Sequence, residues 1–254
     1  MCDLDGTVWL DGHPLPGAVE AIATARSLGH RVLFATNNSS SRPDEIVARL
    51  ERVGIAAKGD VVSSADAIGH LIQPGERVYV IGGTGIRNSV TQHGGKLVNS
   101  ADADVVAVGR DVTFDFSKLT IANRAIRSGA RFVASNDDLT FPTPDGLAPG
   151  VGAILAAITA STGQKPEVAG KPYLPMAEVL RAELGRDMRN TVVIGDLQAT
   201  DGLFAQIIGV PFVLVLCGLT SSAEGLVPRP EFVVADVADF VATYLAPVAA
   251  RLTA

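Results

Sequence analysis

The sequence predicts an α/β protein whose core is a doubly wound parallel sheet, with a smaller α/β unit inserted into it. Short runs of β-branched residues alternate along the chain with segments of helical periodicity, which is the order of repeated βαβ units. Polar and acidic residues follow several of these runs at the point where a strand would end. Open parallel sheets bind ligands at the carboxyl ends of their strands, so this second observation also indicates where a site would lie.

The predicted strands are nearly continuous apolar runs, the type that is buried on both faces of a parallel sheet. In chain order they are residues 31–38 (RVLFATNN), 77–83 (RVYVIGG), 104–109 (DVVAVG), 131–136 (RFVASN), 190–196 (NTVVIGD) and 211–216 (PFVLVL). Together with the helices between them, they indicate a Rossmann-like sheet.

The predicted helices lie between these strands, and each ends at a glycine, the residue preferred just beyond a helix C-terminus. They are residues 16–29 (PGAVEAIATARSLG), 42–54 (RPDEIVARLERVG), 115–129 (DFSKLTIANRAIRSG) and 175–185 (PMAEVLRAELG).

The residues at the strand ends divide the chain into two units. Acidic and amide residues follow strands in the first and last thirds, whereas the middle third has a different set: GGTG (82–85), GRD (109–111) and NDDLTFPTPDG (136–146). We therefore expect residues 1–70 and 166–254 to form one discontinuous core and residues 71–165 to form the inserted unit. Pro, Gly and polar residues mark both boundaries, near 64–75 and 162–168.

Composition limits the possible partners. The chain has 254 residues, of which 47% are hydrophobic and 19% charged, so it can bury a substantial core. Its formal net charge is −6 and Lys and Arg do not cluster, which argues against nucleic acid and membrane surfaces as partners. No apolar run approaches the ~20 residues of a membrane span. The two cysteines lack metal-type spacing, and we expect a soluble protein of the reducing cytoplasm.

The acidic residues at the strand ends predict a cation site. Asp3 and Asp5 lie on one side of an extended chain, and Asp196 ends a later strand. Carboxylates that converged there would raise one another's pKa unless a cation joined them. A small number of hard oxygen ligands suits Mg2+ better than zinc or calcium.

Groups that favour an anion accompany these acids. Thr36 and the following amides occur where a strand turns toward a helix, a geometry that binds anions. Lys171, in the segment AGKPYLP, adds a compact positive charge. A cation, a lysine and amide donors around one point describe a phosphoryl site.

Four motifs in this order resemble those of the haloacid dehalogenase superfamily of phosphatases. They are DLDGT (3–7), ATNNSSS (35–41), GKP (170–172) and GDLQATD (195–201). The TNNSS form, the α/β insertion and the segment 141–158 (FPTPDGLAPGVGAILAAI) resemble its NagD or 4-nitrophenylphosphatase branch, which includes glycerol phosphate and phosphoglycolate phosphatases. The resemblance extends over nearly the whole chain.

This resemblance implies a role for each motif residue. Asp3 would be the nucleophile that forms an aspartyl phosphate, and Asp5 the general acid and base. The Asp3 carboxylate, the Asp5 backbone carbonyl and Asp196 would hold Mg2+, with Asp201 supporting the metal or Lys171. Lys171 would screen Asp3 and the transferring group. The residues expected to bind the phosphate are Thr36, Asn37, Asn38 and Lys171.

The inserted unit would be a cap that closes over the site and selects the leaving group. Its segment 136–146 would face the substrate through Asn136, Thr140 and Phe141. Relatives form dimers through the cap, so a homodimer is also expected.

We therefore predict a Mg2+-dependent phosphatase of small organic phosphomonoesters, with glycerol 3-phosphate first and 2-phosphoglycolate and aryl phosphates next. The apolar Phe141 and the absence of a basic cluster in 136–146 disfavour a multiply charged leaving group. Three alternatives remain: a nucleotide monophosphatase, a catalytically silent phosphate or metabolite binder, and a dinucleotide-binding module at GGTG. The last lacks the G-x-G-x-x-G order.

Two features depart from the family pattern. Only Met1 and Cys2 precede Asp3, whereas a central strand has about five residues, so we expect either missing residues or a shortened strand. Relatives also read GDR and TDI where this chain has Leu197 and Gly202, which predicts weakened metal support.

Overall fold

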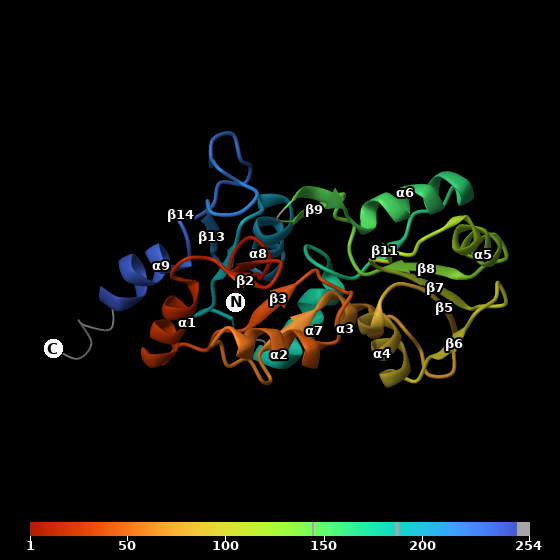
Figure 1. The fold of residues 1–254 in the computed structure, drawn as a ribbon, viewed down its shortest axis with the longest axis horizontal. Helices are drawn as coiled ribbons and strands as arrows, with labels where there is room; N and C mark the ends of the chain where they lie inside the picture. The colour runs from red at the N-terminus through yellow and green to blue at the C-terminus, as the bar shows by residue number, and fades with distance from the viewer. Residues whose placement is uncertain (144, 186–187, 248–254) are drawn as a thin grey trace.

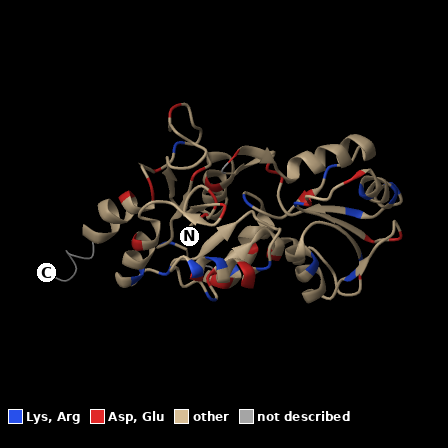
Figure 2. Ribbon diagram, in the orientation of Figure 1, with Lys and Arg blue, Asp and Glu red and all other residues tan. Residues whose placement is uncertain are grey.

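The computed structural model describes residues 1–143, 145–185 and 188–247. Figure 1 shows an elongated molecule with one parallel sheet in each half, and the N-terminus lies inside the half that contains α1 and α2. Acidic and basic segments are interleaved along the ribbon (Figure 2). Among the described helices, none combines the length and apolar character that crossing a membrane requires.

The first sheet is the predicted doubly wound core. Its strands run parallel in the order β4, β3, then the segment around Cys2, then β12, β13 and β14. The strands are β3 (Phe34–Thr36), β4 (Val61–Ser63), β12 (Val193–Gly195), β13 (Phe212–Val215) and β14 (Phe232–Val234).

Side chains alternate between the two faces of this sheet, and helices cover both. Phe34 and Val213 belong to one hydrophobic cluster with residues of α1 (Ala18–Ser27), α2 (Pro43–Arg52) and α9 (Val237–Phe240). Ala35 and Leu214 belong to the other, with residues of α3 (Ser64–Gly69), α7 (Leu174–Leu184) and α8 (Leu203–Ile208). Burial of both faces explains why these strands are apolar without alternation.

The segment around Cys2, just before the first motif, occupies the centre of this sheet. Cys2 donates its N–H to Leu33 O at 2.8 Å and accepts from Ala35 N at 2.9 Å. On the other side, Asp3 donates to Ile194 O at 2.8 Å. This segment is therefore hydrogen-bonded on both sides, and Asp3 lies at its carboxyl end.

The second sheet is also parallel, in the order β11, β8, β7, β5, β6. Helices α4 and α6 lie on its opposite sides (Figure 1). The strands are β5 (Arg77–Ile81), β6 (Lys96–Val98), β7 (Val105–Val108), β8 (Arg131–Ala134) and β11 (Glu167–Val168), and the helices are α4 (Thr84–Gln92), α5 (Phe116–Arg127) and α6 (Val151–Thr162). The remaining elements are two hairpins, β1 (Trp9–Leu10) with β2 (His13–Pro14) and β9 (Thr140–Thr143) with β10 (Gly146–Pro149), and the π-helical turns η1 (Gln198–Gly202) and η2 (Val241–Leu245).

Each predicted strand and helix is present; most are shorter than the predicted segment, and α7 begins one residue earlier, at Leu174. The boundary segment 64–75 begins with a buried helix, α3, which Ser63 caps by accepting from Asp66 N at 3.3 Å. At the other boundary, β11 pairs with β8 of the second sheet. The domain limits at 70/71 and 165/166 remain predictions.

The GGTG segment begins helix α4 where the two halves meet. A Cβ atom on Gly83 would lie 2.4 Å from Ser40 O, and one on Gly85 would lie 2.4 Å from Ser41 O. Thr84 Oγ1 also donates to Ser40 O at 3.3 Å. The glycines therefore allow close contact between α4 and the loop after β3, which accounts for this motif without a dinucleotide.

Candidate active site

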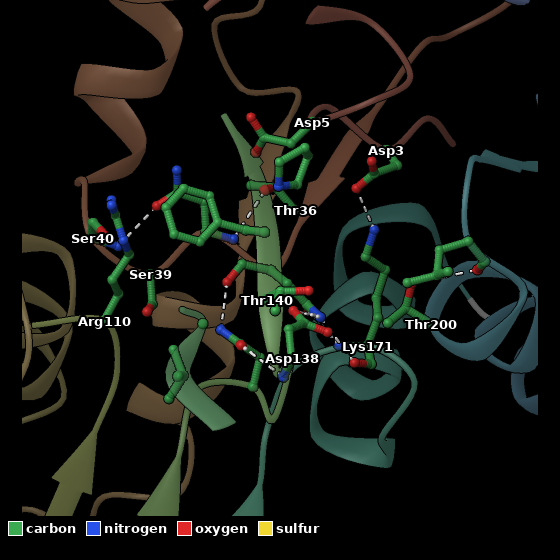
Figure 3. Close-up of a pocket in the computed structure, with 18 of the residues that line it drawn as sticks. Asp3, Asp5, Thr36, Ser39, Ser40, Arg110, Asp138, Thr140, Lys171 and Thr200 are labelled. Atoms are coloured by element: carbon green, nitrogen blue, oxygen red, sulfur yellow. Dashed lines mark hydrogen bonds and ion pairs between the residues drawn. The ribbon is translucent and has the colours of Figure 1, made fainter. Parts of the chain in front are cut away.

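Every residue predicted for the site lines one cavity of about 210 Å3 between the two halves. Figure 3 shows Asp3, Thr36 and Lys171 pointing into it from different elements. The predicted residues that line it are Asp3, Asp5, Thr36, Asn37, Asn38, Asn136, Thr140, Phe141, Lys171, Asp196 and Asp201. The carboxyl ends of β3 and β12 thus meet residues of the second half, as expected for an open sheet.

A buried lysine joins two acids at the base of the cavity. Lys171 Nζ lies 2.6 Å from Asp3 Oδ1 and 2.6 Å from Asp201 Oδ1 (Figure 3 draws the first contact). Burial alone would lower the pKa of Lys171, but the charges of Asp201 and Asp3 outweigh it and raise the pKa above its usual range. Burial raises the pKa of Asp3, and Lys171 opposes that shift. Lys171 is therefore a fixed positive charge beside Asp3.

A third carboxylate completes an acidic cluster. Oxygen atoms of Asp3, Asp196 and Asp201 all lie within 4.8 Å of one another. Burial, followed by the charge of Asp201, raises the pKa of Asp196 to about 6. Because one lysine faces three carboxylates, the cluster carries more negative than positive charge. Three hard oxygen donors are a ligand set that fits Mg2+. The sequence predicted that Asp201 supports the metal or Lys171, and its carboxylate oxygen lies within this cluster.

Backbone groups hold Asp196 in place. Leu219 donates its N–H to Asp196 Oδ2 at 2.6 Å. Gly6, with φ +90°, lies so close that a Cβ atom there would be 2.4 Å from the same oxygen. The glycine of the DLDGT motif is thus required by both its backbone conformation and this contact.

Asp5 is held by the indole of Trp9. Trp9 Nε1 donates to Asp5 Oδ1 at 3.0 Å. Burial raises the pKa of Asp5, and the Trp9 hydrogen bond opposes the shift. A raised pKa favours the protonated carboxyl, which is the form that donates a proton.

The loop after β3 is organised by its own polar side chains. Thr36 Oγ1 accepts from Asn38 N at 3.0 Å, and Asn38 Oδ1 accepts from Ser40 N at 3.0 Å. Asn37 Nδ2 donates both to Asp138 Oδ2 at 3.0 Å and to the carbonyl of Lys171 at 3.1 Å. Both amide hydrogens of Asn37 therefore have protein acceptors, so its side chain holds the loop in place.

Among the residues from the second half, Asn136 links the halves. Asn136 is 4% exposed, and its Nδ2 donates to Asn37 O at 2.8 Å. Thr140 and Phe141 lie on hairpin strand β9 and line the cavity. Contact of these three residues with a substrate remains a prediction.

Sequence reasoning missed two charged residues of the second half, Arg110 and Asp138. The Arg110 guanidinium lies over the Phe141 ring, 4.1 Å from its centroid. Burial raises the pKa of Asp138 to about 6. Both residues follow predicted strands, in the segments GRD and NDD. The rule that ligands bind at the carboxyl ends of strands could therefore have identified them. Segment 136–146 has no basic cluster, but Arg110, which follows another strand, brings a positive charge to the same cavity.

One of the two residues that depart from the family pattern lines the cavity, and the other lies in the turn η1. Leu197 lines the cavity and donates its N–H to Asp201 Oδ2 at 3.3 Å. A Cβ atom on Gly202 would contact the side chain of Gln198 at 2.5 Å. The effect of these two residues on metal affinity remains a prediction.

The chain matches known families over most of its length. A haloacid dehalogenase-like hydrolase model matches residues 1–96, and a HAD-hydrolase-like model matches residues 168–240. The D-glycerol 3-phosphate phosphatase of Mycobacterium tuberculosis is 39% identical over 91% of this chain, which spans about two thirds (66%) of that relative. An acid sugar phosphatase of Staphylococcus haemolyticus is 34% identical, with 88% of this chain and 87% of the relative covered.

Solved structures of phosphatases also resemble this chain. A p-nitrophenyl phosphatase from Archaeoglobus fulgidus has a TM-score of 0.88 at 29% identity, covering 95% of this chain and 97% of that one. A glycerol phosphate phosphatase from M. tuberculosis in complex with magnesium has a TM-score of 0.86 at 38% identity, covering 93% and 74%. By its motifs, their convergence in one cavity and these matches, the chain belongs to the haloacid dehalogenase-like hydrolase family.

Proposed function

We propose that this chain is a Mg2+-dependent phosphatase that hydrolyses a small organic phosphomonoester through an aspartyl phosphate on Asp3. One observation carries the proposal: Lys171 bridges Asp3 and Asp201 at 2.6 Å, with a carboxylate oxygen of Asp196 inside the same cluster. This arrangement presents a nucleophile, a fixed positive charge and a cation site at one point. Mg2+ held by Asp3, Asp196 and Asp201 would neutralise charge on the phosphoryl oxygens.

The reaction has two steps. In the first, an Asp3 carboxylate oxygen attacks phosphorus, the bond from phosphorus to the leaving oxygen breaks, and Asp5 donates its proton to that oxygen. In the second, Asp5 takes a proton from water, the water oxygen attacks phosphorus, and the bond to Asp3 breaks. Lys171 and the Thr36 hydroxyl bind the phosphoryl oxygens. The raised pKa of Asp5 supports its proton-donating role in the first step.

Residues 71–165 act as the cap in this proposal. They supply Asn136, Thr140 and Phe141 to the cavity wall, and Asn136 joins the cap to the β3 loop. A closed cavity excludes water and protects the aspartyl phosphate.

Glycerol 3-phosphate is the first substrate candidate, followed by 2-phosphoglycolate and aryl phosphates. The name of the mycobacterial relative supports the first place of glycerol 3-phosphate. The volume of about 210 Å3 lies below the roughly 300 Å3 at which drug-sized ligand pockets begin, so it favours a small leaving group over a nucleoside.

The test is phosphate release from glycerol 3-phosphate, 2-phosphoglycolate, p-nitrophenyl phosphate and AMP, with Mg2+ or with EDTA. We expect Mg2+-dependent release that Asp3→Asn abolishes and that is lowest for AMP. No release of phosphate by a folded wild-type protein would overturn the proposal and indicate a silent binder.

We further propose a cytoplasmic homodimer that contacts through the cap. Val112 and Phe116 of the cap are 83% and 81% exposed, a level of apolar exposure that contact with a second copy would reduce. The free thiols of Cys2 and Cys217 are consistent with a reducing compartment. Light scattering after gel filtration should give a dimer mass that Phe116→Ser lowers; a monomeric wild-type protein would contradict the dimer.

A further inference from the structure

We propose that Arg110 binds oxygen atoms of the leaving group and thereby determines which phosphomonoesters this chain accepts. The inference deepens the proposed function and rests on it.

The position of Arg110 places it at the cavity and away from the reacting centre. Arg110 comes two residues after β7, a central strand of the second sheet, and lines the same cavity as Asp3 and Asp5. In Figure 3 it lies on the side of Ser39 and Ser40, whereas Lys171 and Asp3 lie on the opposite side. A leaving group that extends across the cavity from a phosphate beside Lys171 would reach the side where Arg110 lies.

Phe141 orients the Arg110 side chain. The guanidinium carbon lies 4.1 Å from the ring centroid, which is the distance of a stacked cation–π contact. A guanidinium stacked on a ring keeps its N–H donors at the edge of the plane, where they can bind oxygen atoms. The stack thus fixes the direction in which Arg110 presents its donors.

Charge pairing distinguishes Arg110 from the other cations of the cavity. Lys171 pairs with Asp3 and Asp201, and Arg49 lies 3.7 Å from Asp11. Within the described part of the chain, Arg110 forms no ion pair with a carboxylate. Its donors are therefore available to a ligand.

The chemistry of Arg110 and Phe141 separates two substrate classes. A carboxylate or a pair of hydroxyls on the leaving group offers acceptors to the guanidinium fork. An aryl leaving group offers fewer acceptors, and its ring would compete with Arg110 for the face of Phe141. Removal of Arg110 should therefore weaken binding of substrates whose leaving group carries a carboxylate or hydroxyls. It should also leave the face of Phe141 free to stack on an aryl leaving group.

The experiment compares kcat and KM of wild type, Arg110→Ala and Arg110→Lys on glycerol 3-phosphate, 2-phosphoglycolate and p-nitrophenyl phosphate with Mg2+. For Arg110→Ala we expect KM for the two oxygen-bearing substrates to rise about tenfold or more, the loss of roughly one charge-assisted hydrogen bond. The ratio of kcat/KM for p-nitrophenyl phosphate to that for glycerol 3-phosphate should rise at least as much. Arg110→Lys should recover only part of the loss, because it lacks the planar fork. Arg124→Ala, at an exposed position of α5, is the matched control.

A second measurement does not require turnover. In an Asp3→Asn background, calorimetry should show that Arg110→Ala weakens glycerol 3-phosphate or 2-phosphoglycolate binding about tenfold relative to inorganic phosphate. Equal losses for all ligands, or no loss for any, would overturn the role of Arg110. Absence of turnover together with a selective binding loss would refute the phosphatase and retain the role of Arg110.

Discussion

Replacement of Lys171 by methionine tests the electrostatic account of the site, because it removes the positive charge and keeps most of the side-chain volume. The Lys171 side chain is 3% exposed, and its Nζ lies 2.6 Å from Asp3 Oδ1 and 2.6 Å from Asp201 Oδ1. Without it, the buried carboxylates of Asp3, Asp196 and Asp201 face one another with no cation.

The expected cost follows from this burial. Removal of one partner of a buried ion pair destabilises a protein by about 3–5 kcal/mol. Each kcal/mol shifts Tm by about 2–4 °C for a chain of roughly this size, so Tm of Lys171→Met in EDTA should fall by about 6–20 °C. Because Mg2+ would replace part of the missing charge, saturating Mg2+ should raise Tm more in the variant than in wild type.

The assay is thermal unfolding followed by circular dichroism, in EDTA and across a Mg2+ titration. Addition of Asp201→Asn to the variant removes one carboxylate charge and should recover part of the loss. A fall below about 3 °C in EDTA, with equal Mg2+ responses in both proteins, would refute the reasoning.

Further predictions concern Asp138, Gly83 and Trp9. Because folding raises the pKa of Asp138 to about 6, protonation of Asp138 stabilises the folded state at low pH, and this stabilisation is lost as pH rises through 6. From pH 7 to pH 5 in EDTA, the free energy of unfolding of wild type should therefore rise by about 1 kcal/mol relative to that of Asp138→Asn. Urea unfolding at both pH values measures this, and identical pH dependences would contradict it. Gly83→Ala should lower the free energy of unfolding by about 1–3 kcal/mol, because its Cβ would lie 2.4 Å from a carbonyl oxygen; unchanged urea unfolding would contradict the contact. Trp9→Phe should raise the pKa of Asp5 and move the corresponding limb of the pH–rate profile to higher pH, and an unmoved limb would count against that hydrogen bond.

The sequence was most informative where function depends on strand ends. Asp3, Thr36 and Asp196 each follow an apolar run, and the parallel sheet brings such ends to one edge. The motif order then added Lys171 and Asp201. These residues converge in the cavity because the order of the strands, which βαβ repetition restricts, fixes their relative positions.

Other features depend on contacts between distant residues, which no local pattern records. Asn37 accepts a hydrogen bond from Lys171 N at 2.8 Å across 134 residues, so its structural role is invisible in the TNN motif alone. The glycines at 83 and 85 matter because a loop from the other half lies against them. Helix α3 was missed because a helix of six residues gives little periodic signal.

The central claim is that Asp3 carries the phosphoryl group, and the most direct test is to trap that intermediate. The Asp5→Asn variant should accumulate it, because the second step needs Asp5 as base. Borohydride added during turnover of p-nitrophenyl phosphate with Mg2+ would reduce an acyl phosphate to the alcohol, and mass spectrometry of the peptide 1–26 would locate the change. The account predicts homoserine at position 3. An unmodified Asp3 in a variant that still releases p-nitrophenol, or reduction at another acid, would contradict it.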